Sequence, residues 1–204
     1  NRFTDCRKAG GTPDGQAAIR LDDTISGMLI YGNVFIRCGL GNKGGVHMRH
    51  GRDNIIDNNL FVGCNQGITG GWDGGNPIWQ TIIRNGDLTP YGGRAAFITN
   101  ALYLSRYPAM ATMLTSPGIN HVWRNVFYRS GPESPPSPSA SLDLVANAGC
   151  GGNDPGFVDA GKGDWRLKPD AAPYADLGFR PIPFDEIGLY QDAYRLGLPG
   201  AERQ

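Results

Sequence analysis

One short phrase recurs four times along this chain of 204 residues. It consists of Asn, any residue, Phe, any two residues, and then Cys or Ser. The four copies begin at Asn1, Asn33, Asn59 and Asn125, which lie 32, 26 and 66 residues apart. The first two intervals fit one structural repeat, and the third fits a repeat with a large insertion. The chain is therefore expected to fold as a solenoid, in which each repeat packs on its neighbours.

The segments that precede these copies predict strands. Residues 19–22 and 46–49 alternate apolar and polar side chains, and the repeats do not supply the apolar spacing of three and four that a helix needs. Glycine makes up 31 of the 204 residues while 40% are hydrophobic, which favours many short strands joined by tight turns over disorder. We expect an all-β fold, a parallel β-helix whose equivalent residues stack about 4.8 Å apart.

Three kinds of residue are expected to form such stacks. Phenylalanine and the aliphatic residues Ile30, Ile56 and Val122 would fill the interior. The four repeat asparagines would form a ladder inside the turns, because Asn accepts backbone hydrogen bonds and tolerates unusual dihedral angles. The third set closes the repeat phrase and would form a column of small buried side chains. Its members are Cys6, Cys38, Cys64 and Ser130.

Two longer stretches, residues 22–35 and 50–61, resemble coils of right-handed parallel β-helix proteins. That group includes pectate-lyase-like polysaccharide lyases and several glycoside hydrolase families. Residues 106–108 and 183–190 resemble C-terminal parts of large bacterial members of the group. The resemblance implies a right-handed solenoid in a carbohydrate-active protein that is secreted or periplasmic. Because the chain opens inside a repeat phrase at Asn1, we expect it to be the C-terminal portion of a larger solenoid.

The chain is expected to divide into two parts. Residues 1–149 would form the β-helix coils, with a partly helical insertion at 65–119. Residues 150–204 would cap the open end of the stack, which otherwise exposes apolar residues and an unpaired strand edge. Within the insertion, Pro90 predicts the start of one helix and Pro108 the start of another.

Alternation also predicts which side chains of the strands face outward. The aligned repeats place Arg20 beside His47 and Asp22 beside Arg49, all on the outer face. A carboxylate can act as acid, base or nucleophile, an imidazole can transfer protons near neutral pH, and a guanidinium can hold a uronate carboxylate. The alternative is an exposed charge ladder in which Asp22 only neutralises Arg49. The candidate catalytic residues are Asp22, Asp23, His47 and His50.

Further residues are candidates for binding the substrate. Arginine suits acidic sugars, and flat aromatic side chains suit sugar rings. The alternative for the aromatic ones is a hydrophobic cluster that holds the insertion to the coils. The candidates are Arg20, Arg49, Arg52, Trp72, Asp73, Arg106 and Tyr107.

Hydrolysis of a complex polysaccharide is the reaction that these residues favour. A glycosidase needs two carboxyl groups, and Asp22 could pair with Asp23, Asp53, Asp57 or Asp73. A polysaccharide lyase acting on a uronate-containing glycan is the alternative, with an arginine or lysine as base. A non-catalytic solenoid that binds glycans or serves as a structural module is the third interpretation.

No cofactor is required by the first interpretation, and calcium is expected only for a lyase. The sequence has no dense acidic cluster for a calcium cage. His47 and His50 face opposite sides of a strand unless His50 lies in the bend after it, so no metal site is expected. Lys plus Arg and Asp plus Glu both total 19, which argues against nucleic acid and anionic membranes as partners. The expected partner is a polysaccharide or oligosaccharide, and the oligomeric state stays open.

Overall fold

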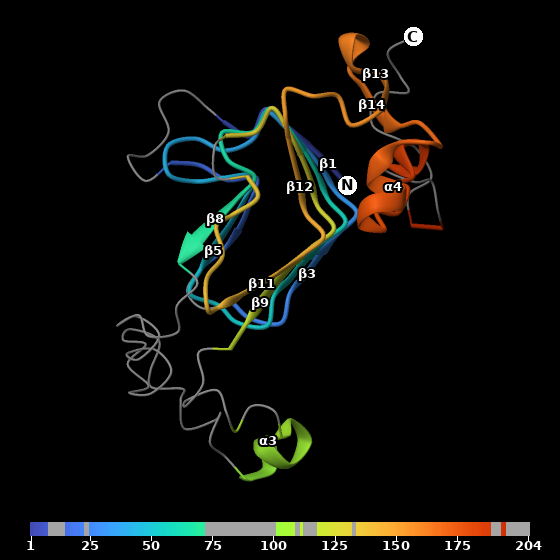
Figure 1. Cartoon of the computed structure of the whole chain (residues 1–204). Coiled ribbons are helices and arrows are strands. Elements are labelled where there is room, and N and C mark those ends of the chain that lie inside the picture. The colour runs from blue at the N-terminus through green and yellow to red at the C-terminus, as the bar shows by residue number, and fades with distance from the viewer. Residues whose placement is uncertain are drawn as a thin grey trace.

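The computed structural model describes residues 1–7, 15–22, 25–71, 101–108, 111, 118–131, 134–188 and 193–194. Within these ranges the chain is mostly β, and its strands are three or four residues long. Most of these strands belong to three parallel sheets (Figure 1). The described helices are short, and none is long and apolar enough to cross a membrane.

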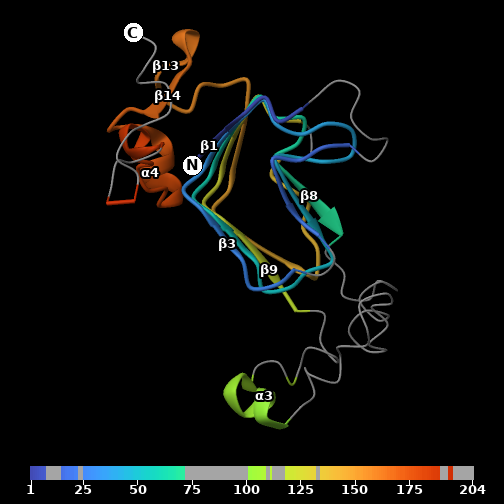
Figure 2. The same ribbon diagram turned by 180° about the vertical axis from the view of Figure 1, so that it is seen from behind.

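Successive strands of the chain pass from one sheet to the next. The first sheet contains β2 (Ile19–Leu21), β5 (Val46–Arg49) and β8 (Ile68–Gly71). The second sheet contains β3 (Leu29–Tyr31), β6 (Ile55–Asp57), β9 (Asn120–Trp123) and β11 (Leu142–Val145). The third contains β1 (Arg2–Thr4), β4 (Val34–Ile36), β7 (Leu60–Val62), β10 (Val126–Tyr128) and β12 (Ala148–Gly151). Figure 2 shows the three sheets around a common interior, an arrangement compatible with a β-helix-like solenoid.

The parallel register places equivalent repeat residues on one another. Phe35 pairs with Phe61, and Phe61 with Phe127. The ring centroids of these neighbours are 4.7 and 4.9 Å apart, and the rings lie nearly parallel. In the second sheet, Ile56 pairs with the predicted neighbours Ile30 and Val122. All six side chains are buried in one core cluster, so the predicted interior columns are confirmed.

The predicted asparagine ladder is also present. The side chain of Asn59 accepts hydrogen bonds from the backbone and side-chain nitrogens of Asn33 and donates to Oδ1 of Asn125. Asn125 in turn donates to Oδ1 of Asn147, which extends the ladder by one residue beyond the prediction. Asn59 and Asn125 are fully buried, so the ladder satisfies polar groups that water cannot reach.

Cys6, Cys38 and Cys64 occupy one column with Ser130, as predicted, whereas Cys150 packs in the cluster on the outer face of the third sheet. The described cysteines are all free thiols, and Cys38 and Cys64 are buried. The Cys64 thiol lies 3.5 Å from the carbonyl oxygen of Phe35, and its backbone N–H donates to Ser130 Oγ. Burial raises the pKa of the Cys6 thiol to about 11. These thiols therefore act as small packing groups next to the phenylalanine column.

Tight corners between the third and first sheets explain part of the glycine content. A Cβ at Gly67 would lie 2.3 Å from the ring of Phe127, and one at Gly45 would lie 3.1 Å from the ring of Phe61. The backbone thus runs directly over the stacked rings. A larger residue at Gly67 would push the ring column apart.

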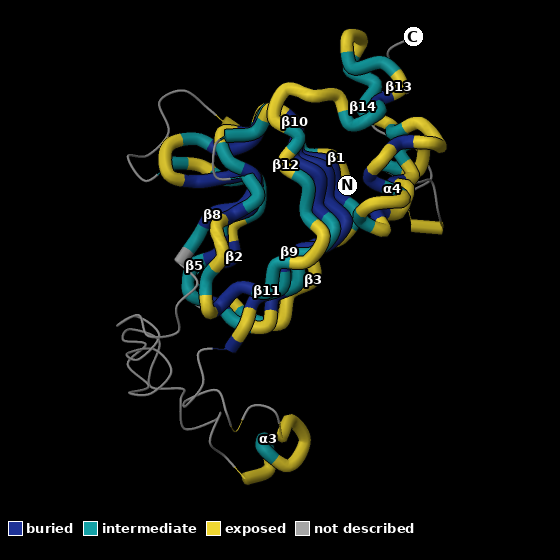
Figure 3. Tube along the Cα trace, in the orientation of Figure 1, coloured by how far each residue is buried: buried dark blue, intermediate teal, exposed yellow. Residues whose placement is uncertain are grey.

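The C-terminal segment covers the outer face of the third sheet. It contains β13 (Phe157–Asp159), the 3-10 helix η3 (Ala160–Lys162), β14 (Asp164–Leu167), α4 (Ala172–Leu177) and η4 (Phe184–Glu186). Leu60 and Val126 point outward from the sheet and are buried in one cluster with Phe157 and Phe179. Figure 3 shows the buried strands of this sheet next to α4. Asn58 and Arg180 exchange two hydrogen bonds across this contact. The described residues of this segment that join the cluster therefore lie along the side of the stack.

The insertion leaves the stack between β8 and β9, at the corner between the first and second sheets. Its described helix, α3 (Ala101–Arg106), lies apart from the sheets and has no buried residue (Figures 1 and 2). Most of the helix expected after Pro90 lies outside the described residues.

The asparagine ladder yields a stability prediction. Asn59→Ala should lower the free energy of unfolding by at least about 2 kcal/mol, because it leaves several buried backbone and side-chain groups without hydrogen bonds. The transition temperature should fall by about 4–8 °C, measured by circular dichroism. The matched control is Asn153→Ala at an exposed position, which should melt like the parent chain. Equal melting of the two variants would refute the role given to the ladder.

Candidate functional site

The outer face of the first sheet carries a compact row of polar side chains. Arg20 pairs with His47, and His47 pairs with Thr69. Leu21 and Met48, the next residues along β2 and β5, point into the core instead. Asp22 directly follows β2 and contacts Arg49 of β5. The predicted neighbours on this face are thus side by side. We call it the polar face, and it consists of Arg20, Asp22, His47, Arg49 and Thr69.

Two ion pairs converge on Asp22. Its carboxylate oxygens lie 2.9 Å from a guanidinium nitrogen of Arg20 and 3.5 Å from one of Arg49. All three side chains are between 38% and 40% exposed, so the group is open to a solute. An ion pair requires the carboxylate form of Asp22, and proton donation by Asp22 would weaken both pairs. In this arrangement Asp22 can act as a base or a nucleophile, or it can simply hold the two arginine side chains in place.

His47 lies in the middle of the polar face. Its Nδ1 is 3.0 Å from Thr69 Oγ1, which also accepts a hydrogen bond from the backbone N–H of Gly44. Burial lowers the pKa of His47 to about 4, and the nearby Lys43 and Arg20 cations contribute. The imidazole is therefore neutral near pH 7. It can accept a proton or a hydrogen bond, but it does not hold the extra proton that a general acid needs.

The corner after β5 holds two further predicted residues. His50 adopts a left-handed backbone conformation with φ of 60°, which places it in the bend. The Arg52 side chain forms an ion pair of 2.6 Å with Asp53 and is only 11% exposed. Gly118 packs directly against the Arg52 guanidinium. Arg52 therefore contacts both this corner and the segment just before β9.

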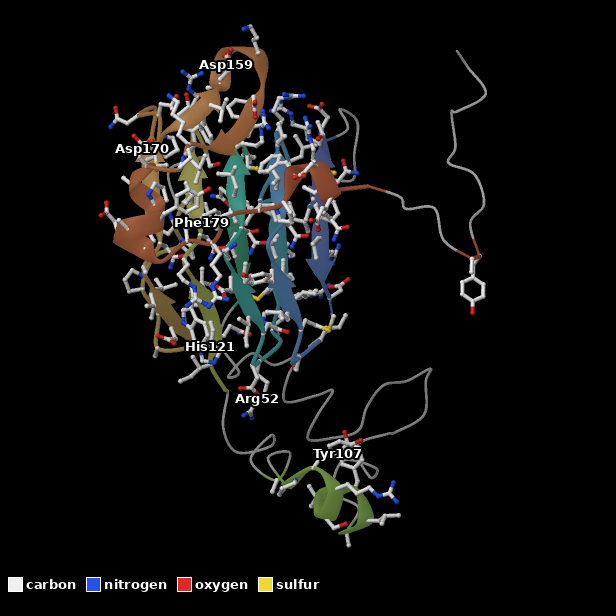
Figure 4. The ribbon with its side chains drawn as sticks, turned by 90° about the vertical axis from the view of Figure 1, so that its right-hand side faces the viewer. Arg52, Tyr107, His121, Asp159, Asp170 and Phe179 are labelled. Carbon is white, nitrogen blue, oxygen red and sulfur yellow. The ribbon has the colours of Figure 1, made fainter. Side chains whose placement is uncertain are left out.

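Three other candidate residues with a described placement, Asp57, Arg106 and Tyr107, are not brought to the polar face. Asp57 is buried on the second sheet, where it pairs with Arg124, so it does not approach Asp22. Arg106 and Tyr107 lie at the end of α3, apart from the sheets (Figure 4). Asp23, Trp72 and Asp73 lie outside the described residues.

A second polar cluster was not anticipated from the sequence. On the outer face of the second sheet, Asp143 accepts hydrogen bonds from the Trp123 indole, at 2.9 Å, and from His121 Nδ1, at 3.0 Å. These bonds lower the pKa of the Asp143 carboxyl. His121 and Asp143 occupy paired positions of β9 and β11, so the sequence could have indicated this cluster only if that pairing had been predicted. The cluster joins the last two strands of this sheet.

The described residues contain no group of three or more His, Cys, Asp or Glu side chains that could hold a metal ion. On the polar face, only Asp22 offers a carboxylate oxygen among the residues with a described placement.

No family model, curated protein or solved structure matches this chain.

His47 yields a pH prediction. Its pKa is about 4 in the folded chain and 6.5 ordinarily, so the unfolded chain binds the proton first as the pH falls. The free energy of unfolding should therefore decrease between pH 6.5 and pH 4, by up to about 3 kcal/mol from this residue. Urea unfolding of the parent and of His47→Gln at several pH values isolates the contribution. An imidazole NMR titration with a midpoint near 6.5 would contradict it.

Proposed function

We propose that the chain is a right-handed parallel β-helix of the pectate-lyase-like type. Three observations support this assignment. The chain passes in turn through three parallel sheets, equivalent residues stack in register, and an asparagine ladder occupies the corner between the second and third sheets. The stretches at residues 22–35 and 50–61, which resemble coils of such proteins, contain β3 with β4 and β6 with β7.

On this scaffold we propose a carbohydrate-active enzyme, most simply a glycoside hydrolase that cleaves a complex polysaccharide. The observation that carries the proposal is the Asp22 carboxylate, which directly follows β2 and lies between the guanidinium groups of Arg20 and Arg49, next to the neutral imidazole of His47 on the paired strand β5. Rigid strands keep such groups in a fixed geometry, which catalysis on a sugar chain requires. A secreted or periplasmic location would fit a polymeric substrate.

The proposed roles follow from the contacts. Asp22 is the base or nucleophile, and Arg20 and Arg49 orient it and bind acidic groups of the sugar. His47 accepts a hydrogen bond from the substrate or from water. Hydrolysis also needs a carboxylic acid that protonates the leaving oxygen. We assign that role to Asp23, which follows Asp22 in the chain.

A polysaccharide lyase is the second candidate, and the position of Arg49 favours it. This guanidinium is 38% exposed and makes the longer of the two contacts with Asp22, so it can approach a uronate. A lyase would use a basic residue to remove the proton next to the uronate carboxylate. Calcium would then be supplied with the substrate, as a neutralising ion.

One assay distinguishes these reactions. The chain is incubated with plant, algal and bacterial polysaccharides, while reducing ends and the absorbance of unsaturated uronates are followed together. We expect reducing ends without the absorbance. Asp22→Asn should then lower the rate by about 10²–10⁴-fold, because it removes the reacting carboxylate. Its thermal transition should stay within about 2 °C of the parent's, since Asp22 is a partly exposed ion-pair residue.

The matched control is Asp164→Asn, which removes an aspartate paired with Arg166 in the C-terminal segment. This variant should keep full activity. Full activity in Asp22→Asn would contradict the assigned role, and a parallel rise of absorbance would establish the lyase. Binding to a polysaccharide without any product would favour the non-catalytic solenoid.

A further inference from the structure

A hollow of about 350 Å³ adjoins the polar face at β8. Its walls come from the loop before β5, from the start of β8 and from the segment after β10. The lining residues are Asn42, Gln66, Ile68, Thr69, Gly70, Pro136 and Ser137. Thr69 belongs both to this hollow and to the polar face, where its hydroxyl contacts His47. The two regions are therefore continuous.

The hollow exists because the three sheets have different lengths. The second and third sheets continue to β11 and β12, whereas β8 is the last strand of the first sheet among the described residues. Residues 134–140 pass the free edge of β8 without adding a strand to it. Ser134 fixes their start by accepting a hydrogen bond of 2.7 Å from the backbone N–H of Gly67. Within the described part of the chain, no strand occupies the space next to Thr69 on this side of β8.

The chemistry of the walls differs from that of the polar face. The side chains that line the hollow are amides, hydroxyls and apolar groups, and none of them is charged. Lys43 is buried and does not line the hollow, although its Nζ lies 3.4 Å from Asn42 Oδ1. Neutral donors and acceptors match the hydroxyl groups of an uncharged sugar. A carboxylate placed there would lose its water without gaining a guanidinium partner from the walls.

The spacing of the strands would allow one glycan chain to contact both the polar face and the hollow. Neighbouring strands are about 4.8 Å apart, close to the length of one sugar unit in an extended chain. A glycan that crosses the strands would meet Arg20 on β2, His47 on β5 and Thr69 on β8, and then enter the hollow. The charged groups and the neutral groups would contact successive sugars.

We propose that the hollow is a subsite for an uncharged sugar, and that the substrate is a heteropolysaccharide containing both acidic and neutral units. The acidic unit lies at Arg20 and Arg49, and a neutral unit lies between Asn42 and Ser137. This inference rests on the proposed function, because it assumes that the polar face binds a glycan.

The test is binding to an array of purified oligosaccharides that are all acidic, all neutral or mixed. Mixed oligosaccharides should bind most tightly. Ser137→Trp fills the hollow from an exposed position and should weaken mixed binding at least tenfold, while binding of all-acidic oligosaccharides stays unchanged. Asn42→Ala should weaken mixed binding by about two- to tenfold, the effect of one lost hydrogen bond.

The matched control is Ala175→Trp on the exposed side of α4, which covers the third sheet and should change nothing. Circular dichroism melting checks that each variant is folded. Acidic oligosaccharides that bind through Arg49, with no gain for mixed ones, would overturn this inference and leave the proposed function intact. Loss of all-acidic binding in Ser137→Trp would overturn the neutral subsite. Binding to no member of the array would overturn both proposals.

Discussion

Parallel pairing in register is the constraint on which the rest of this structure depends. Each repeat position becomes a column, because residue pairs such as Phe35 and Phe61 occupy the same place in neighbouring strands. The buried Asn59 side chain finds hydrogen-bond partners on both sides only in this register. A slip by one residue would turn Phe61 outward and leave the ladder unsatisfied. Apolar packing and polar satisfaction therefore select the same alignment.

The same register also determines what each outer face can do. On the third sheet the outward column contains Leu60 and Val126, and burying these apolar side chains requires the C-terminal segment. On the first sheet the outward column contains Arg20 and His47, which need no such cover. The C-terminal segment thus packs on the side of the stack where burial of apolar surface favours it, and the polar face stays open.

The repeat phrase predicted most of the interior and the neighbours on the polar face, because parallel pairing preserves sequence offsets between strands. The repeat phrase did not predict Asn147, because Gly149 stands where the phrase has Phe. The side chain of Asn147 nevertheless continues the ladder. The apolar residues of the C-terminal segment, such as Phe179, predicted burial but not the surface that buries them. The ionisation of His47 depends on burial and on Lys43, neither of which the local sequence pattern reveals.

The protonation states on the polar face limit how hydrolysis could proceed there. Asp22 is engaged by two guanidinium groups as a carboxylate, and the low pKa of His47 leaves its imidazole neutral near pH 7. Neither group carries a proton to give to a leaving oxygen. Among the described residues of the polar face, Thr69 has a hydroxyl already engaged with Gly44 and His47. A hydrolase built on this face must therefore draw its acid from another residue, which makes Asp23, the next residue in the sequence, the one on which the proposed mechanism depends.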